Sequence, residues 1–103
     1  MKIMIAGSRS IHSFDLSPYI GTQVDLIISG GATGVDQLAE QYADQHKISK
    51  LILRPNYTAY GRHAPLVRNE HMVDLADEVL VIWDGFSKGS AHTISYAKKK
   101  EKN

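Results

Sequence analysis

Three short segments rich in glycine and serine contain most of the residues that could bind a phosphate group. They span residues 7–10, 30–36 and 84–90, and each closely follows a run of apolar residues. Glycine lets the backbone approach a ligand closely, and a helix that begins after such a loop presents unpaired N–H groups with positive partial charge. We therefore expect the loops to bind a phosphate or pyrophosphate. The alternative is that the glycines serve only tight packing of the turns.

A predicted helix between residues 65 and 76 adds an arginine and an asparagine to these loops. At about 100° per residue, Arg68 and Asn69 fall on the face that packs a core helix against its sheet. Near the helix start they would reach over the sheet edge, where a guanidinium binds phosphate through two hydrogen bonds. The alternative is a solvated Arg68, or an ion pair with Glu70 or Asp74. The ligand-binding candidates are Gly7, Ser8, Arg9, Gly30, Gly31, Ala32, Thr33, Gly34, Asp36, Arg68, Asn69, Trp83, Asp84, Lys88, Gly89 and Ser90.

Two carboxylates accompany the loops and are candidates for acid-base chemistry. Asp84 follows an apolar run, a position from which a carboxylate binds ribose hydroxyls or acts as a general base. An ordinary Asp-Gly turn with Gly85 is the alternative. Asp36, at the end of the second loop, is the other carboxylate, and Arg68 completes the set of catalytic candidates. A base could stack on the ring of Trp83, Tyr57 or Tyr60. The alternative is that Trp83 packs against the protein and that the tyrosines cover the sheet edge.

Several common functional motifs are missing from the sequence. The second loop is not followed by Gly-Lys-Ser/Thr and does not match G-x-G-x-x-G, which argues against an ordinary kinase, GTPase or NAD dehydrogenase. The five histidines show no HxH or HExxH spacing and cysteine is absent, so we expect no metal site. We expect no required cofactor beyond a bound nucleotide or phosphate.

The elements that must position these loops are strands alternating with helices. Apolar runs predict strands at 2–6, 24–29, 50–54 and 78–83, of which the first, second and fourth should be buried. Periodicity predicts helices from residue 35, over 65–76 and over 90–100, and a short helix or turn is expected within 11–21. Thr33 and Asp36 have capping-box spacing. We therefore expect a Rossmann-like, three-layer α/β fold with a four-stranded parallel sheet of order 3-2-1-4. Its ligand should lie at the switch point between the first and fourth strands.

Composition limits the remaining possibilities. A chain of 103 residues with 43% hydrophobic and 22% charged residues predicts one domain over 1–103. No apolar segment approaches the roughly 18 to 20 residues of a membrane span, so we expect a cytoplasmic protein without a membrane partner. Four lysines and one glutamate give residues 98–103 a charge of +3, which leaves −2 on the rest of a chain whose total is +1. We expect a flexible basic tail, and the acidic body argues against nucleic acid as a partner. Exposed sheet edges in so small a domain predict a homodimer.

Taken together, the loops resemble the SLOG superfamily, specifically its small YspA-type (YpsA-related) members. The resemblance covers nearly the whole chain and is carried by Gly7-Ser8-Arg9, residues 29–36, Tyr60-Gly61, Arg68-Asn69 with Met72, Trp83-Asp84-Gly85 and Lys88-Gly89-Ser90. It implies a Rossmann-like domain that binds a nucleotide or nucleotide-derived ligand, such as ADP-ribose or a nucleoside monophosphate. It also implies a relation to the LOG phosphoribohydrolases and to the DNA-processing protein DprA.

One position departs from the pattern of the LOG enzymes, whose P-G-G-x-G-T-x-x-E loop ends in a catalytic glutamate. The resemblance matches Gly89-Ser90 to the G-T step and Arg68 to the catalytic arginine of an upstream helix, but Thr93 stands in place of the glutamate. A threonine hydroxyl cannot act as a charged base or stabilise an oxocarbenium ion. Asp36 or Asp84 would have to replace it.

Three functions follow from the sequence. The leading prediction is binding of a nucleotide-derived ligand, for sensing or processing. The first alternative is hydrolysis or transfer at a nucleotide N-glycosidic bond. The second is single-stranded DNA binding in the manner of DprA.

Overall fold

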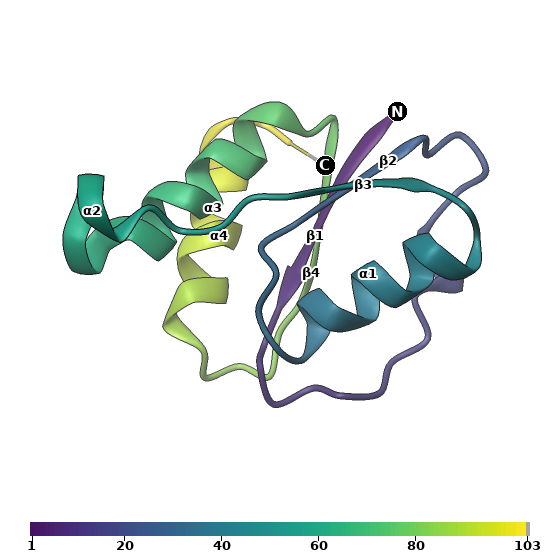
Figure 1. Ribbon diagram of the computed structural model, residues 1–103, viewed down its shortest axis with the longest axis horizontal. Helices are drawn as coiled ribbons and strands as arrows, with labels where there is room; N and C mark the ends of the chain where they lie inside the picture. Colours follow the sequence, from purple (N-terminus) through teal and green to yellow (C-terminus); the bar gives the residue numbers. More distant parts are fainter. Residues whose placement is uncertain (103) are drawn as a thin grey trace.

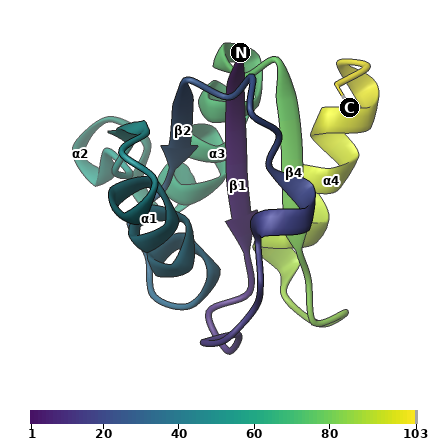
Figure 2. The same cartoon turned by 90° about the vertical axis from the view of Figure 1, so that its right-hand side faces the viewer.

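The structure is a computed structural model that describes residues 1–102, and it places a four-stranded sheet between two layers of helices (Figures 1 and 2). The strands are β1 (Lys2–Gly7), β2 (Leu26–Ser29), β3 (Ser49–Ile52) and β4 (Glu78–Ile82). They are all parallel and lie in the order β3-β2-β1-β4. The predicted α/β class, strand direction and strand order are confirmed.

The helices cover the two faces of the sheet unequally. They are η1 (Ser17–Tyr19), α1 (Val35–Gln45), α2 (Tyr57–Tyr60), η2 (Gly61–His63), α3 (Ala64–Leu75) and α4 (Lys88–Lys99). Helix α1 and the segment containing η1 lie on one face, whereas α3 and α4 lie together on the other (Figure 2). Helix α2 projects from the body of the molecule beside the start of α3 (Figure 1). Within residues 1–102, none of these helices has the length and apolar character needed to cross a membrane.

The core follows from alternation of side chains along the two central strands. Ile3, Ile5 and Ile27 pack on the α1 side, while Met4 and Ile28 pack on the side of α3 and α4. Each of these side chains is at most 2% exposed. Because helices cover both faces of β1 and β2, every position of these strands can be apolar.

The two edge strands are less buried than the sequence predicts. All five residues of β4 are half-buried, although their apolar character predicted full burial. Strand β3 ends at Ile52 rather than at Arg54, and its first three residues are exposed. The physical reason is position in the sheet: β3 and β4 each have a neighbour on one side only, and the helices centre on β1 and β2.

One local expectation is also wrong. The capping box does not form, because the N-cap of α1 is Gly34 and no side chain caps this helix. The predicted basic tail, 98–103, begins within α4, which continues to Lys99, and the Lys102 amide donates to the Ala97 carbonyl at 2.9 Å. The flexibility of this segment stays a prediction. Asn103 lies outside the described residues.

Candidate functional site

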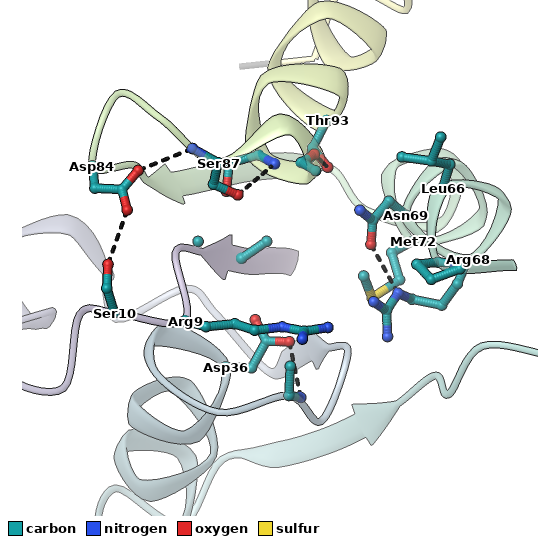
Figure 3. A pocket seen from close by; sticks show the side chains of 16 residues that line it. Arg9, Ser10, Asp36, Leu66, Arg68, Asn69, Met72, Asp84, Ser87 and Thr93 are labelled. Atoms are coloured by element: carbon teal, nitrogen blue, oxygen red, sulfur yellow. Dashed lines mark hydrogen bonds between the residues drawn. The ribbon is translucent and has the colours of Figure 1, made fainter. Parts of the chain in front are cut away.

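A pocket of about 360 Å³, with several charged and polar residues in its wall, lies at the carboxyl end of β1, at the predicted switch point between β1 and β4 (Figure 3). We call it the main pocket. The predicted ligand residues that line it are Gly7, Arg9, Ala32, Asp36, Arg68, Asn69, Asp84, Gly89 and Ser90. The wall also contains residues absent from the predicted set, which are Ala6, Ser10, Pro65, Leu66, Met72, Ser87 and Thr93. Pro65 and Met72 share the helix face that identified Arg68, so the same periodicity could have found them.

The other predicted ligand residues lie elsewhere in the described chain. They are Ser8, Gly30, Gly31, Thr33, Gly34, Trp83 and Lys88. Thr33 and Lys88 are exposed. The Trp83 ring is 42% exposed, and its Nε1 donates to the Ser87 carbonyl at 2.9 Å, which tethers the indole to the loop before α4. The remaining residues of this set act in packing or in hydrogen bonds that hold the loops.

Two glycines allow close backbone contacts around the first loop, Gly7 with β4 and Gly34 between the second loop and the first. A Cβ atom on Gly7 would lie 2.2 Å from the Ile82 carbonyl oxygen of β4. Gly34 has φ of +76°, and a Cβ there would lie 2.5 Å from the Ser8 carbonyl oxygen. Since these neighbours are backbone atoms, no rotamer change could make room. Part of the glycine pattern therefore serves packing, which was the alternative to ligand binding.

Some backbone amides in and beside the first two loops donate hydrogen bonds within the protein. The amides of Ile11 and Val35 both donate to the Ser8 carbonyl at 3.3 Å, and the Ser8 amide donates to Ile82 at 3.0 Å. The Ala32 amide donates to the Asp36 carboxylate at 3.1 Å. These hydrogen bonds help to fix the shape of the two loops, and side chains and the start of α4 add further polar groups to the pocket.

Arg68 is held at the floor of the site by three hydrogen bonds. Its Nη1 donates to the carbonyls of Gly30 (2.8 Å) and Leu53 (3.2 Å), and its Nε donates to Asn69 Oδ1 (2.8 Å). Burial lowers the pKa of the guanidinium, and the neighbouring Asp36 carboxylate opposes this shift. Within residues 1–102, every buried side-chain nitrogen has a hydrogen-bond partner. Nη2 of Arg68 has none, so it is not buried and remains accessible.

The contact with Arg68 also orients Asn69. Because Nε of arginine can only donate, the atom of Asn69 that faces it must be the amide oxygen. The Asn69 NH₂ group consequently points the other way, toward the pocket and the start of α4 (Figure 3). By fixing the orientation of Asn69, Arg68 makes the Asn69 NH₂ group available as an additional donor for a ligand.

Asp36 is the acceptor of the main pocket. The residue is 5% exposed, and burial raises the pKa of its carboxyl group, an effect opposed by the Ala32 amide and by Arg68. Only Oδ2 accepts a hydrogen bond within the described chain. Since no buried side-chain oxygen there is left unpaired, Oδ1 must be accessible, and it belongs to a residue that lines the main pocket.

Asp84, in contrast, is engaged by its own loop. Its Oδ1 accepts from the amides of Phe86 (2.8 Å) and Ser87 (3.1 Å), and Oδ2 accepts from the Ser10 hydroxyl (2.9 Å). Hydrogen bonds from the Phe86 amide first, and then from Ser10 and Ser87, hold the pKa of Asp84 at about 2. A carboxylate of such low basicity is a poor general base at neutral pH. The geometry therefore favours Asp36 over Asp84 for acid-base chemistry.

The first turn of α4 supplies backbone donors. Ser87 is the N-cap, and its hydroxyl accepts from the Ser90 amide at 3.4 Å. The amides of Lys88 and Gly89, at the first two helical positions, have no intrahelical carbonyl available. Nothing lies within 4 Å of the Cβ position of Gly89, so packing does not require glycine there. Thr93 is buried and donates to the Gly89 carbonyl at 3.0 Å.

Arg9 is the free cation of the site. Its side chain extends from the first loop over Asp36 into the pocket (Figure 3). It forms no hydrogen bond or ion pair with any residue from 1 to 102, unlike Arg68. Arg9 is therefore available to an anionic ligand without breaking a hydrogen bond or ion pair within residues 1–102.

The fold and this pocket define the chain as a Rossmann-like α/β domain with a polar site at the switch point of its sheet. Comparison of the chain with protein-family models, with curated proteins and with solved structures found no match.

Proposed function

We propose that the protein binds the phosphoryl group of a nucleotide or nucleotide-derived small molecule in the main pocket. The observation that carries this proposal is the unpaired Arg9 guanidinium in a pocket that also borders the start of α4. Arginine and helix N-termini are both suited to phosphate, the first through paired N–H donors and the second through backbone amides. The Asn69 amide adds a neutral donor at the same wall.

The position of Asp36 favours a ligand that carries hydroxyl groups as well as phosphate. An accessible carboxylate oxygen repels a phosphate but accepts hydrogen bonds from a diol. In this arrangement the phosphate lies near Arg9 and α4, and ribose hydroxyls reach Asp36. Inorganic phosphate alone would use only part of the pocket.

Calorimetric titration with nucleoside 5′-monophosphates, ADP-ribose and ribose 5-phosphate tests the proposal. We expect binding that weakens about tenfold or more in Arg9→Ala, since charge-assisted hydrogen bonds contribute roughly 1.5–3 kcal/mol. Arg62→Ala is the matched control, because Arg62 is exposed and lies outside the main pocket. No binding of any probe, or equal loss in both variants, would contradict the proposal.

A second candidate is cleavage of the N-glycosidic bond of a bound nucleotide, with Asp36 as the acidic group. It is favoured by the accessible Oδ1 and by the pKa that burial raises. Asp36→Asn should then abolish release of free base, measured by chromatography, while ribose 5-phosphate still binds. If the wild type releases no base from any nucleotide that it binds, this second candidate is wrong and ligand binding alone remains.

We also propose that the protein forms a homodimer through the free edge of β4. This strand pairs only with β1, and its five residues are half-buried. The opposite edge is more polar, with Lys50 exposed on β3 and Pro55 shortly after it, features that hinder strand pairing. Sedimentation equilibrium should detect a dimer, and a monomer at every concentration would refute this.

A further inference from the structure

A second, smaller cavity adjoins the main pocket at Arg68, whose side chain lines both. We call it the side pocket. It has a volume of about 160 Å³ and is lined by Leu53, Arg54, Asn56, Tyr60, Ala64, Val67, Arg68 and His71. Ordinary small-molecule sites occupy roughly 300 Å³ or more, so this cavity fits one group of a ligand rather than a whole ligand.

The geometry of α3 explains why the two cavities meet at Arg68. At about 100° per residue, Ala64, Val67 and His71 share one face of the helix, and Asn69 and its neighbours face the main pocket. Arg68 lies between these faces. Because its Nε and Nη1 are tied to protein acceptors, the side chain is a fixed partition whose Nη2 remains accessible.

The side pocket combines an apolar surface with an exposed aromatic ring. Leu53, Ala64 and Val67 supply the apolar part. Tyr60 is 44% exposed, and its ring meets that of His71 edge to face, with centroids 6.4 Å apart. Tyr60 belongs to the single turn α2, which projects from the body of the protein, so its ring contributes little to the core (Figure 1).

Polar groups border this apolar surface. The Asn56 side-chain oxygen caps α2 by accepting from the Ala59 amide at 3.1 Å, which leaves the NH₂ group of Asn56 as a donor. The Arg54 side chain is exposed and makes no hydrogen bond or ion pair within the described chain. An aromatic wall, an apolar surface and a few polar donors suit a flat heterocycle whose ring stacks and whose edge accepts hydrogen bonds.

We propose that the side pocket binds the nucleobase of a ligand whose phosphate and ribose occupy the main pocket, with stacking on Tyr60. This inference rests on the proposed function, because it takes the main pocket as the phosphate site. It adds that the protein discriminates nucleotides from sugar phosphates. In this arrangement the bond between the ribose and the base lies beside Arg68, where the two pockets meet.

The test compares adenosine 5′-monophosphate with ribose 5-phosphate by isothermal titration calorimetry on the full chain. We expect the nucleotide to bind roughly 5- to 100-fold more tightly, the range that base stacking on an aromatic side chain supplies. Tyr60→Ala should remove this difference and leave the affinity for ribose 5-phosphate unchanged, whereas Tyr60→Phe should keep it. Tyr19→Ala is the matched control, because Tyr19 is 55% exposed and lies outside both pockets.

Each other outcome is decisive. Equal affinity of the wild type for the two probes, or equal weakening of both by Tyr60→Ala, overturns the inference while the proposed function stands. The affinity difference between the two probes could instead survive Tyr60→Ala and disappear in Arg54→Ala, with inorganic pyrophosphate binding more tightly than phosphate. That result would assign the side pocket to a second phosphate group and would also overturn the inference. If neither probe binds, the inference fails, and the proposed function fails with it when ADP-ribose and the other nucleoside monophosphates do not bind either.

Discussion

Replacement of Arg68 by methionine is expected to destabilise the fold strongly, whereas the same replacement of Arg9 is not. Arg68 Nη1 bridges the carbonyls of Gly30, directly after β2, and Leu53, directly after β3. Methionine retains much of the side-chain volume but donates no hydrogen bond, so both carbonyls lose a charged donor. Such bonds contribute about 1.5–3 kcal/mol each when buried. Because Arg68 is only half-buried, we expect a loss of about 2–4 kcal/mol in the free energy of unfolding.

Urea denaturation followed by far-ultraviolet circular dichroism measures this loss. For a domain of 103 residues, the same change should lower the Tm by roughly 9–18 °C. Arg9→Met removes a side chain that has no protein hydrogen bond, so its stability should stay within about 0.5 kcal/mol of the wild type. Equal destabilisation of the two variants, or a loss below about 1 kcal/mol for Arg68→Met, would refute the role of Arg68 as a tie between strands.

Three further predictions concern the loops. Gly34→Ala should cost roughly 3 kcal/mol or more, seen as a lower urea midpoint, because its Cβ would meet the Ser8 carbonyl 2.5 Å away at a φ of +76°; a loss under 1 kcal/mol would contradict this packing. Since the pKa of Asp36 is raised on folding, its burial should reduce the free energy of unfolding progressively as pH rises above the ordinary value of 3.8. The stability of Asp36→Asn relative to the wild type should therefore increase over that pH rise, and a stability difference that does not change with pH would disprove the shift. The pKa of Asp84 is lowered to about 2, so its contribution to the free energy of unfolding is present above pH 3.8 and lost as pH falls toward 2. Asp84→Asn should therefore be less stable than the wild type at neutral pH and equally stable in acid. A stability difference that is independent of pH would argue against the hydrogen bonds of this loop.

The two arginines illustrate how far the sequence could predict the site. The sequence identified both arginines as candidate phosphate ligands, Arg68 by its residue type and helical spacing and Arg9 by its residue type and its place in the first loop. The structure separates them, because Arg68 donates to carbonyls 38 and 15 residues away in sequence and Arg9 donates to none within residues 1–102. Such distant carbonyl partners leave no mark in the local sequence. Arg68 therefore has a structural task beside any contact with a ligand.

The two aspartates differ for the same reason. Each lies in a glycine-containing loop segment that follows an apolar strand, which made them equivalent candidates. Asp84 is occupied by the amides of its own loop and by the Ser10 hydroxyl from the first loop. Asp36 retains an accessible oxygen within a buried environment. Only the approach of the first loop, 74 residues away from Asp84 in sequence, completes this distinction.

The α/β class, the parallel sheet, the strand order and the end of the sheet where the pocket lies could all be predicted from the sequence. These properties follow from apolar periodicity and from the handedness of crossover connections, which are local features of the chain. Tertiary structure alone decided which polar groups face the pocket and which hold the loops together. A donor forms a hydrogen bond with the acceptor that lies within about 3 Å in the folded protein. Packing decides which acceptor that is, and it joins segments that are far apart in the sequence.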